Sequence, residues 1–439
     1  MKFSNLPLSL TDMSAPVIGI ASRTQTPKGL RLHIGLFGRR NAGKSSLINA
    51  LTNQKIAIVS DVPGTTTDPV EKACELAPIG PVVFIDTAGV DDVGELGGLR
   101  TERSLAVLGW VDVALIVCDA KALTESELEL IRTVKSTATP TVVVLNKADT
   151  ADAKELIATQ EQVRSLGYEP VTVCASQKLN IDAVREAVVK LAQNAVEPDL
   201  PLLGDLVHPG DTVMLVTPID TGAPKGRMIL PQVQAIREVL DADAKCIVVR
   251  ENRLAETLTN EKEPPAFVVT DSQVVQSVVA QTPKTIPVTT FSIQMAYSKC
   301  DLVEMACGAA MIDFLHPGDK VMICETCSHH PQPDDIGRKK LPRWLAKKVG
   351  GELDIEVVVG KDFPVDLTPY KLILQCGGCV VTRRHMLTRL AQAKRQNIPM
   401  TNYGVAISHL QGVLERALEL HPKALKAFHE AREIFANHF

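Results

Sequence analysis

Short apolar runs alternate with segments of helical periodicity from Leu30 to about Ala195. The apolar runs read LHIGLFG, PVVFID, VDVALIVCDA, TVVVLNK and PVTVCAS. Short apolar runs of this kind, set between helical patterns, are typical of strands. Strands that alternate with helices indicate βαβ units and a mostly parallel sheet. The pattern therefore predicts an α/β domain in this part of the chain.

Two Pro-containing breaks divide the rest of the chain, VEPDLPLLGD at 196–205 and VAQTPKTIPVTT at 279–290. Apolar runs and helical patterns resume after each break, which indicates two further α/β units. A length of 439 residues agrees with this number of domains. The predicted division is a lead over 1–28, a first domain over 29–196, a second over 203–280 and a third over 288–439.

The tetrapeptide His-Pro-Gly-Asp occurs twice, starting at His208 and at His316, each time before an apolar run. Pro and Gly favour turns, so the repeat is interpreted as a shared turn before a strand. A duplication of the two units is the alternative, which four residues alone do not decide.

A phosphate-binding loop joins the first apolar run to the first helical pattern. The segment GRRNAGKSS places Gly38, Gly43, Lys44 and Ser45 in the spacing G-x4-G-K-[ST]. N–H groups of such a loop and of the following helix face the phosphates, and the lysine reaches the outer ones. Ser45 can bind magnesium.

Further segments follow in the order that a GTP site requires. DTAG at 86–89 ends a strand, so Asp86 suits the magnesium shell and the Gly89 N–H can sense a γ-phosphate. NKAD at 146–149 ends another strand, and the Asp149 carboxylate can accept two N–H bonds from a guanine edge. At the same edge adenine presents a hydrogen-bond acceptor where guanine presents a donor, so the pattern favours GTP over ATP.

The remaining elements of the site are a switch loop, PGTTTDP at 63–69, and a weak base-contacting segment, CAS at 174–176. The predicted catalytic residues are Lys44, Thr66, Asp86 and Gly89, with Ser45 and Thr66 as magnesium ligands. The predicted nucleotide-binding residues are Gly38, Asn41, Ala42, Gly43, Lys44, Ser45, Ser46, Asp86, Thr87, Gly89, Asn146, Lys147, Asp149 and Ala175.

This half of the chain resembles the translation-factor-like GTPases, and within them the branch of Era and the tRNA-modification GTPases. Val90 follows DTAG where Ras-like proteins carry a catalytic glutamine, so we expect slow hydrolysis. Asn41 matches the asparagine with which potassium-activated members hold K+ beside the phosphates, in the role of an arginine finger. The resemblance thus implies GTP, Mg2+ and K+ as cofactors. A loop-capping side chain is the alternative interpretation of Asn41.

Four of the ten cysteines form two C-x-x-C pairs, Cys324 with Cys327 and Cys376 with Cys379. Thiolates select zinc, Cu(I) and iron–sulfur clusters. Zinc ribbons separate their pairs by about 15 to 20 residues, whereas residues 328–375 intervene here. The two pairs must therefore converge from two strand ends, where open α/β sheets form their ligand crevice. The other six cysteines lie in or beside apolar segments and are interpreted as buried small side chains.

Charge and composition narrow the choice of function. A formal net charge of -4 and an aromatic content of 4% give neither a basic footprint nor a stacking surface for nucleic acid. No apolar stretch approaches the about 18 residues of a membrane-spanning helix, and the N-terminal segment lacks the build of a secretory signal. We therefore expect a cytoplasmic protein with no nucleic-acid partner and no membrane contact.

The motifs CETCSHHPQPDDIGRKKLPRWL, QCGGCVVTRRHML and PMTNYGVAIS follow a GTPase of this branch. In that combination the chain, from about Gly29 to its end, resembles the maturation GTPases of iron-only (FeFe) hydrogenases, the HydF family. The resemblance implies a P-loop GTPase domain, a small α/β dimerisation domain and a C-terminal α/β domain that binds a [4Fe-4S] cluster. It also implies a homodimer that acts as a scaffold or carrier. Such a carrier receives a transient diiron subcluster precursor from two radical-SAM maturases and delivers it to the apo FeFe hydrogenase.

The family pattern of Cys-x-His and a later His-Cys-x-x-Cys implies Cys327, Cys376 and Cys379 as cluster ligands. Gln375 stands where many members carry histidine, and a carboxamide is a poor iron ligand. The fourth position is therefore open among His329, His330 and Asp334, with His329 and Asp334 as the predicted additional ligands, or it is exchangeable. Cys324 lies outside the family pattern and is interpreted as a core side chain.

Other interpretations remain open from the sequence. The chain is alternatively a GTPase of RNA or ribosome assembly with a C-terminal zinc domain, or a redox enzyme with exchanging thiols. The basic segment 337–344 is interpreted as a solvated helix start, with docking of an acidic partner as the alternative. Segment 223–241 predicts an amphipathic helix with Ile229, Val233, Ile236 and Val239 on about one face. That face packs on its own strands or forms a dimer contact, and the family resemblance favours the dimer.

Overall fold

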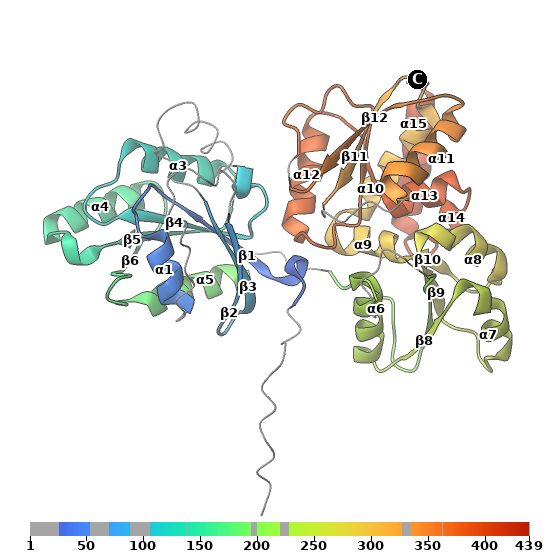
Figure 1. Ribbon diagram of the computed structural model, residues 1–439, viewed down its shortest axis with the longest axis horizontal. Helices are drawn as coiled ribbons and strands as arrows, with labels where there is room; N and C mark the ends of the chain where they lie inside the picture. Colours follow the sequence, from blue (N-terminus) through green and yellow to red (C-terminus); the bar gives the residue numbers. More distant parts are fainter. Residues whose placement is uncertain are drawn as a thin grey trace, which may run out of the picture.

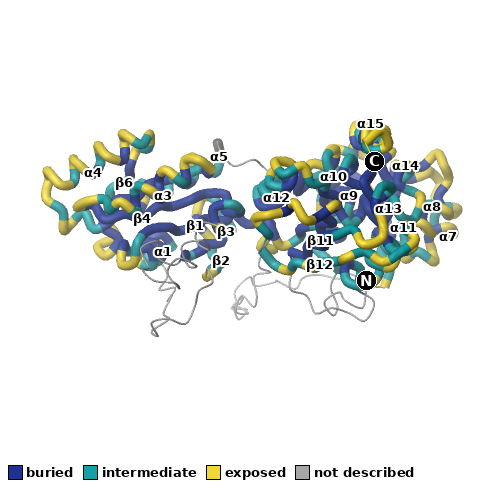
Figure 2. Tube along the Cα trace, turned by 90° about the horizontal axis from the view of Figure 1, so that it is seen from above, coloured by how far each residue is buried: buried dark blue, intermediate teal, exposed yellow. Residues whose placement is uncertain are grey.

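A computed structural model describes residues 26–52, 70–87, 106–137, 139–194, 200–219, 228–326, 335–361 and 363–438. These residues form three sheets (Figure 1). The central strands of each sheet are buried, and exposed residues concentrate on outer helices such as α4 (Ala153–Ser165) and α15 (Pro422–Ala436) (Figure 2). The α/β fold predicted from the alternation of strands and helices is confirmed. Among the helices described, none combines the length and apolarity needed to cross a lipid bilayer.

The first sheet has the strand order β2-β3-β1-β4-β5-β6 and is parallel except for β2, which runs antiparallel to β3. Its strands are β1 Leu32–Phe37, β2 Val70–Leu76, β3 Gly80–Asp86, β4 Val113–Asp119, β5 Thr141–Asn146 and β6 Val171–Thr172. Besides α4, its helices are α1 Lys44–Thr52, α3 Glu125–Ser136 and α5 Ile181–Asn194. Every residue of β4 is buried, because apolar clusters cover both faces of the sheet. Parallel strands of this kind read as continuous apolar runs, which explains why the sequence pattern located them.

The second sheet has the order β10-β9-β7-β8 and the third has the order β12-β11-β13-β14. The strands of the second are β7 Thr212–Val216, β8 Lys245–Val249, β9 Phe267–Thr270 and β10 Val288–Thr290. Those of the third are β11 Lys320–Glu325, β12 Asp354–Val359, β13 Leu372–Gln375 and β14 Met400–Asn402. The longer helices around them are α6 Leu230–Asp241, α7 Leu254–Asn260, α8 Val275–Gln281, α9 Phe291–Lys299, α10 Leu302–Ala310, α11 Leu341–Val349, α12 Arg383–Arg395 and α13 Tyr403–Leu410. A short helix, α14 Leu414–Ala417, precedes α15.

The second and third sheets follow the same path. Both are entirely parallel, and in each the first strand lies between the second and the third. The first strand follows the His-Pro-Gly-Asp turn in both, and the turns are closed alike by His208 N–H to Asp211 Oδ2 and His316 N–H to Asp319 Oδ2. The repeated tetrapeptide therefore marks the start of two structurally equivalent units. Strand β10 completes the second sheet, although it lies in the range 288–439 that the sequence predicts for the third domain.

The first domain contacts the third through several polar side chains. Lys299 of α9 donates a hydrogen bond to the Gly29 carbonyl at 2.6 Å, just before the chain enters β1. Arg384 of α12 donates to the Thr139 hydroxyl at 3.0 Å. Lys361, which follows β12, pairs with Glu71 of β2. These contacts bring the third domain against the first sheet and the segments that lead into β1 and β5.

Candidate functional site

The loop between β1 and α1 has the shape of a phosphate cradle. Gly38 and Gly43 have positive φ angles of 142° and 95°. A Cβ atom at Gly38 would lie 2.2 Å from the Val117 carbonyl oxygen, and one at Gly43 would lie 2.1 Å from Asn146 Nδ2. Only glycine fits at either position, because both the backbone conformation and the close approach exclude a side chain. Ala42 is buried in the same loop, and Ser46 is exposed on α1.

The predicted magnesium and phosphate residues meet at the end of β3. The Lys44 ammonium donates to the carbonyl oxygens of Gly38 and Arg39, at 2.9 and 3.0 Å, which holds it above the loop. Burial raises the pKa of the Asp86 carboxyl, although Lys44 and a hydrogen bond from Ser45 oppose the rise. Within the described chain, Asp86 Oδ1 is buried and has no hydrogen-bond partner. A buried carboxylate oxygen beside a serine hydroxyl fits a magnesium shell, because Mg2+ is bound by oxygen atoms.

Thr87, the residue after β3, bonds to the neighbouring strand β1. Its hydroxyl donates to the Leu36 carbonyl at 2.6 Å and its N–H donates to the same oxygen at 3.2 Å. The side chain is therefore engaged with β1 in this structure.

The predicted base-binding residues are brought together by Asn146. Its Nδ2 donates to the Ala42 carbonyl at 2.9 Å, and its Oδ1 accepts the Ala175 N–H at 3.0 Å. The buried asparagine thus joins the phosphate loop to the CAS segment. Asp149 is exposed beside it and accepts hydrogen bonds from Cys174 Sγ at 3.1 Å and from Gln177 Nε2 at 3.3 Å. An exposed carboxylate at the rim can exchange these weak donors for the N–H groups of a guanine.

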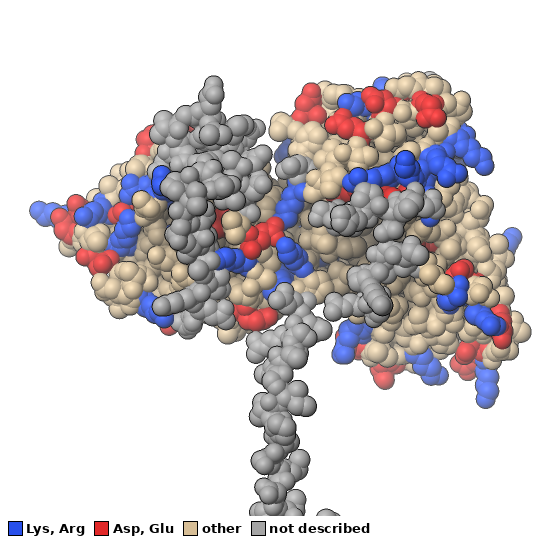
Figure 3. Space-filling model, viewed as in Figure 1, with Lys and Arg blue, Asp and Glu red and all other residues tan. Residues whose placement is uncertain are grey.

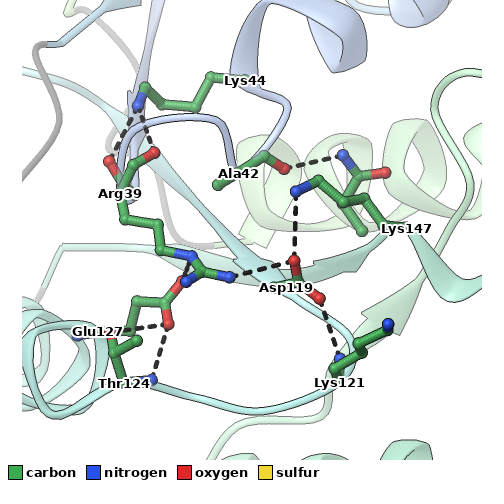
Figure 4. Close-up of polar contacts among 10 residues, drawn as sticks. Arg39, Ala42, Lys44, Asp119, Lys121, Thr124, Glu127 and Lys147 are labelled. Carbon is green, nitrogen blue, oxygen red and sulfur yellow. Dashed lines mark hydrogen bonds and ion pairs between the residues drawn. The ribbon is translucent and has the colours of Figure 1, made fainter. Parts of the chain in front are cut away.

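An ion-pair network that no sequence motif indicates lies beside the phosphate loop (Figure 4). Arg39 Nη2 lies 3.1 Å from Asp119 Oδ2, and Arg39 Nε lies 3.6 Å from Oε1 of the fully buried Glu127. Lys147 approaches the same Asp119 oxygen at 3.2 Å. Burial opposes ionisation of Asp119, but the Lys121 N–H, Lys147 and Arg39 outweigh it, so the pKa of this carboxyl is lowered. The network anchors the loop to β4 and α3, and no sequence spacing indicates it.

Several predicted residues lie outside the described residues, namely Thr66, Gly89, Cys327, His329, His330 and Asp334. Val90, which bears on the expected slow hydrolysis, is also outside them. In the described part of the chain, no group of three or more His, Cys, Asp or Glu side chains comes together as a metal site.

The two cysteine segments converge at the carboxyl edge of the third sheet. Strand β11 ends at Glu325, and the N–H and hydroxyl of the next residue, Thr326, each lie 3.2 Å from Cys376 Sγ. The Cys376 N–H also donates to the Cys324 carbonyl at 2.9 Å. The described ends of the two cysteine segments, at Thr326 and Cys376, therefore meet across the ends of β11 and β13.

This convergence occurs at the topological switch point of the sheet. Strand β11 lies between β12 and β13. The chain therefore moves to one side of β11 to form β12 and then crosses to the other side to form β13. In open parallel sheets, ligands bind in the crevice that such a reversal opens beyond the strand ends. Cys376 and Thr326 lie at that point, and Cys379 follows one turn later and is partly buried against Met295 and its neighbours.

Cys324 faces the core. Its side chain is fully buried in the apolar cluster between the third sheet and its helices, and burial raises the pKa of its thiol to about 12. A neutral buried thiol is a small apolar side chain, which agrees with the interpretation made from the sequence.

The basic segments near the cysteines are partly engaged within the protein. Arg338 pairs with the buried Glu325 at 2.9 Å, and Lys340 donates to Gln273 at 2.7 Å. Arg383 donates to the carbonyl oxygens of Ser298 and Cys300. Lys and Arg side chains nevertheless form a band on the third domain near α11, whereas both charges are interspersed elsewhere on this face (Figure 3).

Three family models match successive parts of the chain. Residues 33–147 match the 50S ribosome-binding GTPase model, residues 202–300 the hydrogen maturase F dimerization domain, and residues 303–420 the hydrogen maturase F tetramerization domain. The first domain is therefore a P-loop GTPase domain, and the two structurally equivalent units carry the models named for oligomerisation.

Curated relatives match the first domain. The tRNA modification GTPase MnmE of Trichormus variabilis is 37% identical over 167 residues, which are 37% of this chain and 34% of the relative. The GTPase Der of Wolinella succinogenes is 34% identical over 172 residues, 37% of this chain and 36% of the relative. The chain thus spans about a third of the length of the relatives it matches. Among solved structures, Era of Aquifex aeolicus bound to GDP.AlF4- has a TM-score of 0.33 at 21% identity and covers 50% of this chain and 92% of its own.

Proposed function

Because this chain belongs to the hydrogen maturase F family, we propose that it is a GTP-hydrolysing scaffold for assembly of the FeFe hydrogenase active site. In this proposal it binds a [4Fe-4S] cluster and carries the diiron subcluster precursor to the apo hydrogenase. The observation that supports the proposal most is the contact of Thr326 with Cys376, which joins the two cysteine segments at the switch point of the third sheet.

The GTPase role rests on how the described residues are arranged. Lys44, held above the loop, neutralises charge on the outer phosphates. Ser45 and Asp86 would hold Mg2+, which when bound stabilises the charge that develops on the transferred phosphoryl group. Asp149 and the Ala175 segment would select guanine. Asn41, in the exposed part of the loop, would hold K+ beside the phosphates.

The cluster role rests on the donor set at the strand ends. Cys376 and Cys379, with Cys327 beyond the described residues, would hold the cluster, and His329 or Asp334 would fill or leave open the fourth position. The Cys376 sulfur accepts the Thr326 N–H and lies 3.2 Å from the Thr326 hydroxyl, which suits a thiolate ligand because such groups stabilise negative charge. When bound, the cluster supplies an iron that can accept a ligand of the diiron unit.

The partners follow from the carrier role. We propose that two radical-SAM maturases load the diiron precursor and that the apo FeFe hydrogenase receives it. The dimerization and tetramerization models support oligomerisation, and we propose a homodimer formed through the second domain. The band of Lys and Arg near α11 is a docking surface for an acidic partner in this proposal.

The first test is the metal content of the protein. After purification and reconstitution without oxygen, we expect about four iron and four sulfide per chain and an EPR signal on reduction. Cys376→Ala and Cys379→Ala should each lose most of the iron and the signal, because two thiolate ligands lie on this loop. Cys307→Ala is the matched control, since this half-buried thiol of the same domain bonds the Ala427 carbonyl, away from the site.

The contrary result distinguishes the alternative function. Stoichiometric zinc without an EPR signal would show a structural metal domain instead of a cluster carrier. The chain would then be better described as a GTPase of RNA or ribosome assembly with a zinc domain.

A further inference from the structure

Gln375 is the residue that departs from the family pattern, and it lies inside the protein. It ends strand β13, where it is fully buried and stands in register between Cys324 of β11 and Asn402 of β14. A buried carboxamide must place both its oxygen and its nitrogen in hydrogen bonds, because an unsatisfied amide costs about 1–3 kcal/mol. The partners of Gln375 therefore reveal what the side chain does.

Arg389 decides which way the Gln375 carboxamide points. Arg389 is a buried residue of α12, and its guanidinium donates to three acceptors: His385 Nε2 at 3.1 Å, Gln375 Oε1 at 3.0 Å and the Gly360 carbonyl at 2.9 Å. A guanidinium has only donors, so the Gln375 atom that faces it must be the oxygen. The planar fork of arginine holds its three acceptors in fixed directions.

The nitrogen of the carboxamide then faces the cysteine loop. Gln375 Nε2 lies 3.5 Å from Cys376 Sγ and 3.4 Å from the Cys376 carbonyl oxygen. The same sulfur accepts the Thr326 N–H and lies 3.2 Å from the Thr326 hydroxyl, which can donate to it when the sulfur is a thiolate. Three groups that can donate, from the ends of β11 and β13, thus surround one sulfur atom.

We propose that Gln375 is a positioning residue that donates an N–H···S hydrogen bond to Cys376, and that Arg389 fixes it in this orientation. It does not ligate iron. The inference rests on the proposed cluster role and deepens it. Hydrogen bonds to ligand sulfurs raise the reduction potential of iron–sulfur clusters, because they stabilise the more negative reduced state. Gln375 therefore raises the reduction potential of the cluster without binding iron. A histidine at this position would instead change the coordination of the iron.

The test is a redox titration of the reconstituted full-length protein, followed by EPR, on two variants. Gln375→Leu removes both amide groups. Gln375→Glu keeps an oxygen that accepts from Arg389 but removes the N–H donor. It therefore preserves the buried contact with Arg389 and tests the inference even if the leucine variant fails to fold. We expect both variants to keep the iron content of the wild type and to titrate at a more negative midpoint potential.

The matched control is Gln392→Glu. Gln392 also lies in this domain, on α12, but bonds the carbonyl oxygens of Pro364 and Val365. The Gln392→Glu variant adds the same charge as Gln375→Glu without contacting Cys376. The midpoint potential of its cluster should therefore stay close to that of the wild type. An unchanged potential in both Gln375 variants at full iron content would overturn the inference.

Two other results are distinct from that one. Loss of iron in Gln375→Glu and Gln375→Leu as complete as in Cys376→Ala would make Gln375 a ligand and overturn the positioning role. A wild-type protein that holds no cluster would overturn the proposed function itself, and this inference with it.

Discussion

Two asparagines of the nucleotide site act in different ways. Asn146 is buried, and both ends of its carboxamide are used to join the phosphate loop to the base-binding segment. Asn41 is exposed in the loop and has a φ angle of 59°, a left-handed conformation that asparagine tolerates better than most residues. Its side chain is therefore placed at the surface of the cradle, where an ion beside the phosphates can be reached.

We predict that GTP turnover is severalfold faster in potassium than in sodium. In the proposed role, K+ held by Asn41 would add positive charge near the transferred phosphoryl group and would stabilise the transition state. The variant Asn41→Gly keeps the left-handed backbone and deletes the carboxamide, so its rates in the two salts should become equal. The measurement is steady-state phosphate release at matched ionic strength.

The control for this prediction is Asn180→Gly. Asn180 has a φ angle of 58° and bonds the Thr172 carbonyl, so the backbone change is the same at a site away from the phosphates. It should keep the potassium effect. Equal rates of the wild-type protein in the two salts would refute the role of Asn41.

At the scale of elements, the second and third domains use the same unit for different purposes. The Asp271 N–H donates to the Val216 carbonyl at the switch point of the second sheet, as the Cys376 N–H donates to the Cys324 carbonyl in the third. The backbone positions are equivalent, but an aspartate that caps a helical turn stands where the other unit has a cysteine. The unit thus joins the ends of two neighbouring strands in the same way in both cases, and in the third sheet the residue at that position carries a thiol.

Helix α6 and the edge strand β8 present apolar side chains to solvent in the single chain. Val233 and Leu240, seven residues apart on α6, are 49% and 55% exposed, and Val248 of β8 is 42% exposed. Val239 of the same helix is buried against its own sheet, so the predicted face is divided between the two roles. Exposed apolar side chains beside an unpaired strand edge are typical of an interface.

We predict that Val233→Glu weakens the proposed homodimer at least about tenfold, which corresponds to about 1.4 kcal/mol, because a charge would be buried in the contact. Sedimentation or light scattering over a concentration series measures the dissociation. Ile157→Glu on α4 of the first domain is the control, since Ile157 is 55% exposed. Equal dissociation constants for the wild type and Val233→Glu would place the interface elsewhere.

At the scale of the whole molecule, Trp110 is the centre of the contact between the first and third domains. The Lys361 ammonium lies 3.6 Å from the centroid of its ring, and the rings of His33 and His385 lie 6.1 Å from it. Lys361 also pairs with Glu71, which Lys28 approaches at 3.0 Å. Glu71 lies on β2, directly after residues 53–69, so the contact is close in sequence to the predicted switch loop.

The titratable groups of this contact respond differently to burial. Burial lowers the pKa of His33 to about 4, and Lys361 adds to the effect, while Glu71 opposes it. Burial also lowers the pKa of His385, with Arg389 next in importance. At Lys361 burial outweighs the pairing with Glu71, so its pKa is lowered. Burial opposes ionisation of Glu71, but Lys361 and Lys28 outweigh it and lower the pKa of this carboxyl.

We predict that the chain loses stability as the pH falls from 6.5 towards 4. The unfolded state binds a proton at His33 below its ordinary pKa of 6.5, whereas the folded state excludes that proton until about 4. Below this pH window, His33 alone lowers the free energy of unfolding by about 3 kcal/mol, and His385 acts in the same direction. The stabilisation from Glu71 is present above its unfolded pKa of 4.5 and is lost at still lower pH.

Thermal unfolding of the full chain across this pH range measures the effect. His33→Gln removes the titrating ring, so the pH dependence of its unfolding temperature should be shallower than that of the wild type. His208→Gln, at an exposed histidine of the second domain, should keep the wild-type slope. Identical slopes in all three proteins would show that His33 is not excluded from protonation in the folded state.

The sequence by itself determined the features that depend on local spacing. The phosphate loop could be predicted because Gly38 and Gly43 are required by the backbone of the loop itself, and the apolar runs predicted the strands of a mostly parallel sheet. The convergence of the cysteine segments also followed from the rule that parallel strands end at one edge. The division of the chain and the roles of residues outside the described ranges remain predictions.

Only the tertiary structure decided which side chains from distant segments meet. Arg39 with Glu127, Thr326 with Cys376, Arg389 with Gln375 and Lys361 with Trp110 are each joined by the packing of separate elements. No periodicity or motif encodes such pairs, because an ion pair or hydrogen bond depends on distances in space, and these are set by how the sheets and helices pack. The same reason explains why the repeated His-Pro-Gly-Asp turn, ambiguous as four letters, became evidence of equivalent units when both sheets were seen to follow one path.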